Sequence, residues 1–217
     1  MKKIVELFFV FSFFFSACAQ LEPKHTFNIE VGIPVPVANP FFKGVMKSVV
    51  NISPYYQYRL KSSLAFGVGV NYSHLQIDKF KIPNAEPVKG GMHSGGVFLK
   101  VSHEKFHNEQ FATDFGVKFG YNKNYFETDY NDTIYGKAQT VNSFSVTPTL
   151  GFILSVDEFT SYRFTIAYAV NNFGFSPSRL GMNTNGGFDP SKFSTFTKCA
   201  IFGFGFTHYF SKNKPTD

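Results

Sequence analysis

Residues 111–121 read FATDFGVKFGY, and this stretch decides the fold. Large apolar residues alternate with small or polar ones along most of it. A period of two is typical of a β-strand whose two faces meet different surroundings. The same pattern recurs in seven further segments, namely 27–35, 50–60, 64–73, 97–102, 144–152, 162–170 and 202–210. The sequence therefore predicts eight strands, and we expect no amphipathic helix between them.

The composition of the two faces indicates which one points outward. A face that meets water would carry many Lys and Glu residues, but the polar face here is mostly Gly, Ala, Ser and Thr. Small residues fit the narrow interior of an eight-stranded barrel, and large apolar residues fit a lipid surface. Closure also pairs every strand, as a bilayer requires. We predict an all-β fold, an eight-stranded antiparallel up-and-down transmembrane β-barrel. The alternative is a soluble barrel with an apolar interior.

The connections between the predicted strands alternate in length. Short ones fall at 61–62, 103–110 and 155–159, and long ones at 36–44, 74–91, 122–139 and 171–193. Short turns at one end and long loops at the other are typical of outer-membrane barrels. We therefore expect both termini in the periplasm and the long loops at the cell surface. Lys198 falls on the apolar face of the last strand, which predicts a bulge near Cys199 or a membrane edge there.

The N-terminus has the pattern of a secretory signal peptide over residues 1–19. A basic start at Lys2 and Lys3 precedes an apolar run, and Ala17 and Ala19 stand at the positions that signal peptidase favours. Cleavage after Ala19 leaves residues 20–217 as the barrel domain. The alternative is a lipoprotein box in which Cys18 is acylated.

Composition excludes several classes of protein. A hydrophobic content of 43% with 19% aromatic residues excludes a disordered chain. The net charge is +6, but its basic residues are scattered, so we expect no nucleic-acid partner. The two cysteines form no cluster with histidines at zinc-site spacing, so we expect neither a metal site nor a cofactor.

The last strand reads FGFGFTHYF over residues 202–210. Together with the signal peptide and the alternating turns and loops, it resembles the small bacterial outer-membrane β-barrels of the OmpA-like and OmpX-like type common in Bacteroidota. The resemblance covers essentially the whole mature chain but is architectural and specifies no activity. It implies outer-membrane lipid around the barrel and recognition of Phe206 and Phe210 by the barrel assembly machinery. His208 departs from the pattern, as do the seven residues after Phe210.

Charged residues on the small-residue face form the first candidate site. Buried charges persist only when they are paired and hydrogen-bonded. We therefore predict an ion-pair network that plugs the lumen, and the alternative is a gate for a narrow, porin-like ion path. Its members are Glu30, Arg59, Lys100, Asp114, Lys118 and Arg163.

No catalytic residues are predicted. The Ser–His neighbours at 73–74, 93–94 and 102–103 are adjacent, so on a strand they point to opposite faces. This disfavours an enzyme that modifies lipid A. His103, Glu104, His107 and Glu109 are expected in a solvated turn.

Aromatic residues in the long loops form the second candidate site. Tyr125, Phe126, Tyr130 and Tyr135 lie beside acidic residues, a composition that suits contact with a partner. The segment 171–193 is either a binding loop or a mobile one. We expect a non-enzymatic barrel with a structural or interaction role, its partner being another outer-membrane or surface protein. The alternative is an accessory subunit of a secretion or assembly complex.

Overall fold

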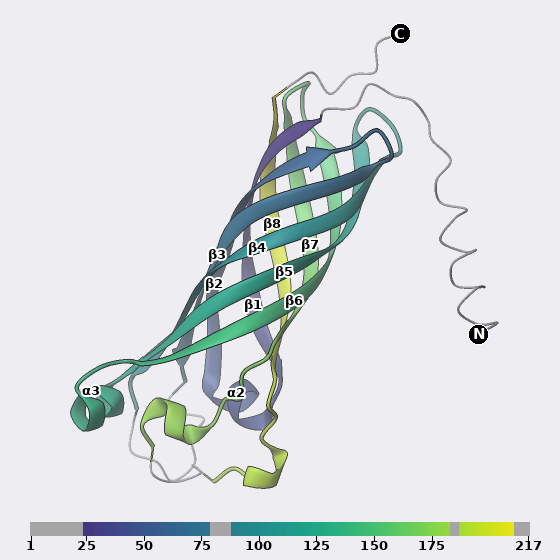
Figure 1. The fold of residues 1–217 in the computed structure, drawn as a ribbon. Coiled ribbons are helices and arrows are strands. Elements are labelled where there is room, and N and C mark those ends of the chain that lie inside the picture. The colour runs from purple at the N-terminus through teal and green to yellow at the C-terminus, as the bar shows by residue number, and fades with distance from the viewer. Residues whose placement is uncertain (1–23, 79–87, 183–186, 211–217) are drawn as a thin grey trace, which may run out of the picture.

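The computed structural model describes residues 24–78, 88–182 and 187–210; the predicted signal peptide and Cys18 lie outside these ranges. Eight antiparallel strands follow one another in order, and β8 pairs with β1 to close a barrel (Figure 1). This confirms the predicted fold. The strands are β1 (His25–Ala38), β2 (Met46–Arg59), β3 (Leu64–Ile77), β4 (Gly90–Phe106), β5 (Phe111–Thr128), β6 (Gln139–Ser155), β7 (Thr160–Asn171) and β8 (Thr197–Tyr209).

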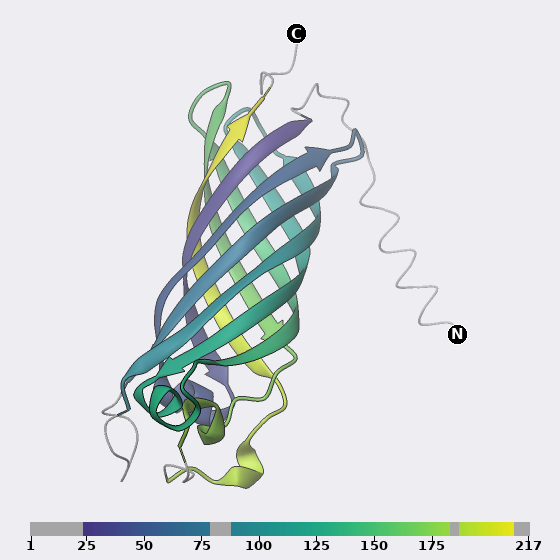
Figure 2. The same cartoon turned by 60° about the vertical axis from the view of Figure 1, so that its left-hand side comes forward.

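The two ends of the barrel differ. At the turn end, short turns join β2 to β3, β4 to β5 and β6 to β7, and β1 begins beside the end of β8. Two short helices and two 3₁₀ segments of the described residues lie at the loop end, where Figures 1 and 2 show short coiled ribbons. These are α2 (Pro40–Val45), α3 (Asp129–Tyr135), η2 (Pro177–Leu180) and η3 (Pro190–Lys192).

The expectation of no amphipathic helix between the strands is wrong, because these helices are too short to detect by periodicity. Neither α2 nor α3 exceeds seven residues, which is about two turns. Local capping defines α2 instead, since the Asn39 side chain accepts hydrogen bonds from the backbone N–H groups of Phe41 and Phe42. Within the described ranges, no helix is long and apolar enough to cross a membrane.

Side-chain burial confirms which face points outward. Leu99 and Phe115 are 61% and 64% exposed on the outer surface. Their chain neighbours Lys100 and Asp114 are each only 1% exposed inside. The soluble alternative, an apolar interior under a polar surface, is therefore wrong.

Several strands continue beyond their predicted ends. β4 already begins at Gly90 and β5 runs to Thr128, although 74–91 and 122–139 were expected to be connections. The reason is a change in the phase of the alternation. Near the loop end the outward positions become polar and the inward positions become apolar.

Three strands show this inversion directly. Leu75, Met92 and Phe126 point inward and are buried, whereas Gln76 and Lys123 point outward and are exposed. A pattern of this phase indicates an apolar interior and an aqueous exterior, the opposite of the middle of the barrel. The inversion therefore marks the edge of the apolar outer band.

The irregularity expected near Cys199 lies on the neighbouring strand. Pro36 pairs with Cys199 and Ala38 pairs with Lys198, so Val37 is an extra residue in β1. Lys198 itself lies at the loop end, beyond the inversion of the pattern.

The apolar core of the molecule closes the loop end of the barrel. Phe175 is at its centre, and its ring centroid lies 5.3 Å from that of Phe41, 5.1 Å from that of Phe42 and 5.8 Å from that of Phe126. We call this set of buried side chains the loop-end core. It comprises Phe41, Phe42, Val45, Met46, Leu75, Ile77, Val88, Met92, Phe126, Phe173, Phe175, Leu180, Met182 and Cys199.

Candidate functional site

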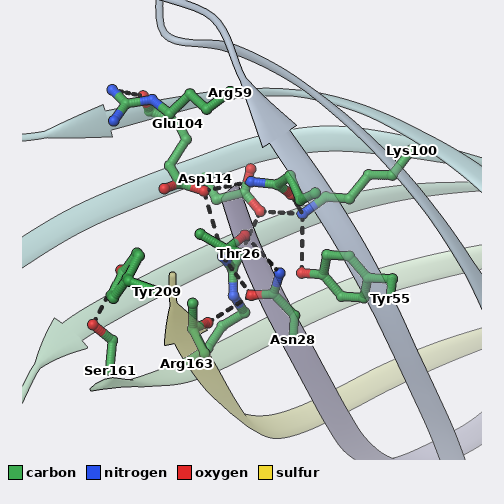
Figure 3. Close-up of polar contacts among 12 residues, drawn as sticks. Thr26, Asn28, Tyr55, Arg59, Lys100, Glu104, Asp114, Ser161, Arg163 and Tyr209 are labelled. Carbon is green, nitrogen blue, oxygen red and sulfur yellow. Dashed lines mark hydrogen bonds and ion pairs between the residues drawn. The ribbon is translucent and has the colours of Figure 1, made fainter. Parts of the chain in front are cut away.

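Charged side chains from four strands, β1, β4, β5 and β7, meet inside the barrel, toward the turn end. Figure 3 shows Lys100, Glu104, Asp114 and Arg163 among them. Three carboxylates face three cations there, so their charges balance. We call this set the lumenal cluster. It comprises Glu30, Lys100, Glu104, Asp114, Lys118 and Arg163.

Asp114 is the point where two cations converge. Its Oδ2 atom accepts hydrogen bonds from Arg163 Nη1 on β7 and from Lys100 Nζ on β4. All three side chains are almost completely buried. Each charge therefore depends on its partners, because water cannot replace them.

Glu30 is held from two sides. Its Oε2 atom accepts a hydrogen bond from Lys118 Nζ at 2.8 Å, and its Oε1 atom accepts one from the Tyr55 hydroxyl at 2.7 Å. The Lys118 ammonium also lies 4.9 Å from the ring centroid of Phe98. Cation–π contact of this kind favours a desolvated ammonium. The two lysines at opposed positions in β4 and β5, Lys100 and Lys118, thus bind different carboxylates.

Glu104 is a member of the lumenal cluster that the sequence did not predict. We expected it in a solvated turn, but β4 continues to Phe106, so Glu104 keeps the inward parity of Lys100 and is 1% exposed. Gln57 Nε2 donates a hydrogen bond to its Oε2 atom at 2.7 Å, and Arg163 Nη2 lies 3.5 Å from the same oxygen.

Tyr55 was also missed, although its position in β2 has the same inward parity as Gln57 and Arg59. Arg59 was predicted in the network and lies at its turn-end edge. Its Nη2 atom donates a hydrogen bond to the backbone carbonyl of Glu104 at 3.0 Å, and its guanidinium lies 4.6 Å from the Phe106 ring centroid. Side-chain ion pairs join Lys100 and Arg163 to Asp114, and a separate ion pair joins Lys118 to Glu30. Hydrogen bonds at the Tyr55 hydroxyl connect the two groups.

Inward glycines make room for these large side chains. A Cβ atom on Gly69 would lie 2.5 Å from the Pro54 carbonyl oxygen and closer still to Tyr55 Cβ. A Cβ atom on Gly151 would lie 3.1 Å from Arg163 Nη1. The small residues on the inward face therefore leave the space that the large side chains of the lumenal cluster fill.

A polar chamber lies between the lumenal cluster and the loop-end core. Its volume is about 90 Å³, enclosed by Glu30 and Lys118 on one side, by Phe42 and Phe173 on the other, and by Asn, Ser and Thr side chains around the wall. That volume is well below the roughly 300 Å³ at which small-molecule pockets begin. The chamber is therefore a small gap between two closed layers.

The adjacent Ser and His residues point to opposite sides of the barrel wall, as expected. Ser94 and Ser102 are buried in the lumen, while His93 and His103 lie on the outer face. Neither pair therefore brings a hydroxyl and an imidazole to one surface. Among the residues that the structure describes, no three His, Cys, Asp or Glu side chains are grouped to hold a metal ion.

The predicted loop contacts separate into different environments. Tyr125 is 40% exposed and lies on the outer face of β5. Phe126 is fully buried in the loop-end core, so its assignment as a contact residue is wrong. Tyr130 is half-buried against the same core, and the side chain of Tyr135 lies outside the described residues. Sequence alone could not separate these roles, because an aromatic residue among polar neighbours suits both a contact and a core.

The segment 171–193 is likewise tied to the loop-end core. Phe173 and Phe175 are buried there, and Phe188 packs against it. These three phenylalanine side chains therefore pack in or against the loop-end core.

Phe206 and Phe210, the expected assembly signal, lie at the turn end with exposed side chains. Phe206 is on the outer face of β8, opposite Ile29 of β1. Just beyond the strand, the backbone N–H of Phe210 donates to the His25 carbonyl at 3.1 Å. Both residues therefore lie where the barrel closes.

Comparison with known proteins identifies the fold. No protein-family model matches the chain, and no curated protein matches it. Among solved structures, Neisserial surface protein A is 13% identical, with a TM-score of 0.51 over 86% of this chain and 97% of its own. The outer membrane protein OprG from Pseudomonas aeruginosa is 13% identical, with a TM-score of 0.52 over 88% of this chain and 98% of its own. The chain therefore has the fold of the small outer-membrane β-barrels.

Proposed function

We propose that this chain is a non-enzymatic outer-membrane barrel, closed to solutes, whose loop end presents a rigid surface to another molecule of the cell surface. The observation that carries the proposal is the division of side chains across the barrel wall. Apolar and aromatic residues cover the outside, and a charge-balanced cluster fills the inside. A barrel of this kind needs lipid around it and offers no open pore.

The proposed orientation places the loop end outside the cell and the turn end in the periplasm. Both ends of the described barrel, His25 and Phe210, lie at the turn end. Exposed Phe206 and Phe210 then face the compartment from which the barrel assembly machinery acts. This arrangement agrees with the short periplasmic turns of known barrels.

The loop-end core supports an interaction role. Loops that pack around buried phenylalanines are ordered before any partner arrives, which reduces the entropy that binding costs. The side chains left exposed around α3 are polar, among them Asp132 and Lys137. The proposed contact surface is therefore polar and preorganised.

Photo-crosslinking in cells tests the interaction. A photoreactive amino acid replaces Lys137 at the loop end, and the matched control replaces Lys105 on the outer face of β4 at the turn end. We expect a defined crosslinked protein or glycan from position 137 and none from position 105. Absence of a crosslink from position 137, and from Asp132 in a second variant, would contradict an interaction role. Co-purification of a stoichiometric membrane partner would instead favour an accessory subunit of a larger complex.

The polar chamber favours a second candidate, a narrow ion channel. Its Asn and Ser walls could hydrate an ion if the lumenal cluster opened. Planar-bilayer recording of the wild type, Glu30→Ala and Arg163→Ala decides between the two. The closed-barrel proposal predicts that the wild type shows no ion conductance. Discrete conductance steps in the wild type that change in either variant would support the channel.

A further inference from the structure

The outer surface carries a notch near the loop end, centred on Gly95 of β4. In the register of the sheet, Gly95 lies between Tyr72 of β3 and Lys123 of β5. A Cβ atom on Gly95 would meet nothing within 4 Å. The backbone is therefore open to the outside between two long side chains, on strands that are direct neighbours in Figure 1.

Hydrogen-bonding groups line the notch. The Tyr72 hydroxyl lies 2.7 Å from His93 Nδ1, and the His93 ring stacks on that of His74 with a centroid distance of 4.3 Å. On the other side, Lys123 Nζ lies 5.2 Å from the Tyr125 ring centroid. We call Tyr72, His74, His93, Lys123 and Tyr125, together with Gly95, the head notch.

An apolar groove continues from the head notch toward the middle of the barrel. Its volume is about 350 Å³, and nearly all of its surface is apolar. Val97 and Tyr121 are the next outward residues after Gly95 and Lys123, so groove and notch are contiguous. The outward-facing side chains that line the groove are Val68, Val97, Leu99, Phe119, Tyr121 and Phe144.

The head notch lies where the outer band ends. Lys123 is on the polar side of the inversion described above, and Tyr121, two residues earlier, is on the apolar side. This position is where the head of a membrane lipid meets its acyl chains. The nearest outward carboxylate on β5 is Glu127, farther toward the loop end and beyond Tyr125. An anionic group is therefore drawn to the Lys123 side of the notch.

We propose that the head notch and the groove bind one molecule of lipid A, the phosphorylated glycolipid of the outer leaflet. The assignment to that leaflet rests on the orientation under the proposed function. The lipid A phosphate meets the Lys123 ammonium, and the sugar hydroxyls meet the Tyr72 hydroxyl and the His93 imidazole. One acyl chain lies in the groove. A glycolipid fits better than a simple phospholipid because the notch offers one cation and several uncharged hydrogen-bonding groups.

Native mass spectrometry of the detergent-purified barrel tests the site. The probes are purified lipid A and phosphatidylglycerol, each titrated against the wild type and four variants. Lys123→Ala removes the charge, His93→Ala removes an imidazole, and Gly95→Leu fills the notch while leaving every polar group in place. Lys105→Ala is the matched control, because it removes an outward lysine from the same sheet at the turn end.

We expect the wild type to retain one lipid A in preference to phosphatidylglycerol. Lys123→Ala is expected to weaken retention by about tenfold, the effect of one charge-assisted hydrogen bond. Gly95→Leu is expected to weaken it as well, and Lys105→Ala to leave it unchanged. Equal retention of both lipids, or retention insensitive to Lys123→Ala and Gly95→Leu, would overturn the proposal.

A gel assay separates failure of this inference from failure of the proposed function. Each variant is also run boiled and unboiled, since a folded barrel and its boiled form migrate differently. If the heat-dependent shift persists in every variant and the notch variants bind lipid A more weakly, as expected, the lipid site and the proposed function are both supported. If the shift persists but the notch variants retain lipid A as well as the wild type does, the lipid site alone is wrong. If the wild type shows no shift and is not in the outer-membrane fraction, the proposed function is wrong.

Discussion

The Glu30 carboxylate and the Lys118 ammonium meet across the barrel, with Oε2 and Nζ 2.8 Å apart. Their strands, β1 and β5, lie four positions apart in the closed ring of eight, so they are on opposite sides of the lumen. The two residues are 88 positions apart in the chain. This ion pair links the two halves of the wall, and the Tyr55 hydroxyl connects it to Lys100 and so to the rest of the lumenal cluster.

The Glu30–Lys118 pair can be tested by exchanging its charges. Glu30→Lys places a third cation beside Lys118 and Lys100, and Lys118→Glu places a second carboxylate beside Glu30. Each single variant is expected to lose about 3–5 kcal/mol of unfolding free energy, as when a buried pair is broken. The double variant restores opposite charges and should recover about 1–3 kcal/mol relative to the sum of the singles. Urea unfolding in lipid vesicles measures this, and strictly additive losses would contradict a direct pair.

Two glycines on the barrel wall provide a matched test of lumen packing. Gly69→Ala places a methyl group against Pro54 and Tyr55, and overpacking of this kind costs about 1–3 kcal/mol. Gly95→Ala points outward into open space and should change stability by less than about 0.5 kcal/mol. The same urea assay compares the two. Equal effects would mean that Gly69 does not lie against Tyr55.

The inward and outward faces of the strands could be predicted, because the alternation of residue types along each strand reports directly which side chains share a face. Every strand in the apolar band repeats the contrast between large outward and small inward residues. What could not be predicted is which inward residues meet, because pairing across the lumen depends on the tilt and stagger of all eight strands. Glu30 and Lys118 could be placed inside, but not in contact.

The other misses have specific causes. The sequence does not predict that Glu104 lies in a strand, because the apolar pattern of the fourth strand stops at residue 102. The sequence pattern does not reveal the burial of Phe126, because the phase of the alternation inverts near the loop end, where inward residues pack against loops. A search for strands that permits such an inversion would have extended β5 and placed Phe126 inside.

The loop-end core is tested by two neighbouring aromatic residues. Phe126→Ala removes a buried ring that packs against Phe173 and Phe175, a change that costs about 3–5 kcal/mol in a packed core. Tyr125→Ala removes an exposed ring one residue away. We expect Phe126→Ala to expose the loop end to limited proteolysis while the strands remain protected, and Tyr125→Ala to leave the cleavage rate unchanged. Equal cleavage of the two variants would contradict a packed core.

The reactivity of the Cys199 thiol tests whether the loop-end core is closed. The thiol lies in the loop-end core and is buried, so a maleimide cannot reach it in the folded barrel. We expect no labelling before boiling and full labelling afterwards. Thr133→Cys on the exposed side of α3 is the positive control and should label in the folded state. Rapid labelling of Cys199 in the folded barrel would show that the loops do not close over it.

The most direct measurement of the central claim is the migration of this protein from the outer-membrane fraction on an SDS gel, boiled against unboiled. Closed barrels of this kind stay folded in SDS until heated. A lipid-exposed barrel whose interior holds the ion-paired lumenal cluster predicts that the protein is recovered in the outer-membrane fraction and that its mobility changes on boiling. Recovery in the soluble periplasmic fraction, with the same mobility before and after boiling, would contradict the account.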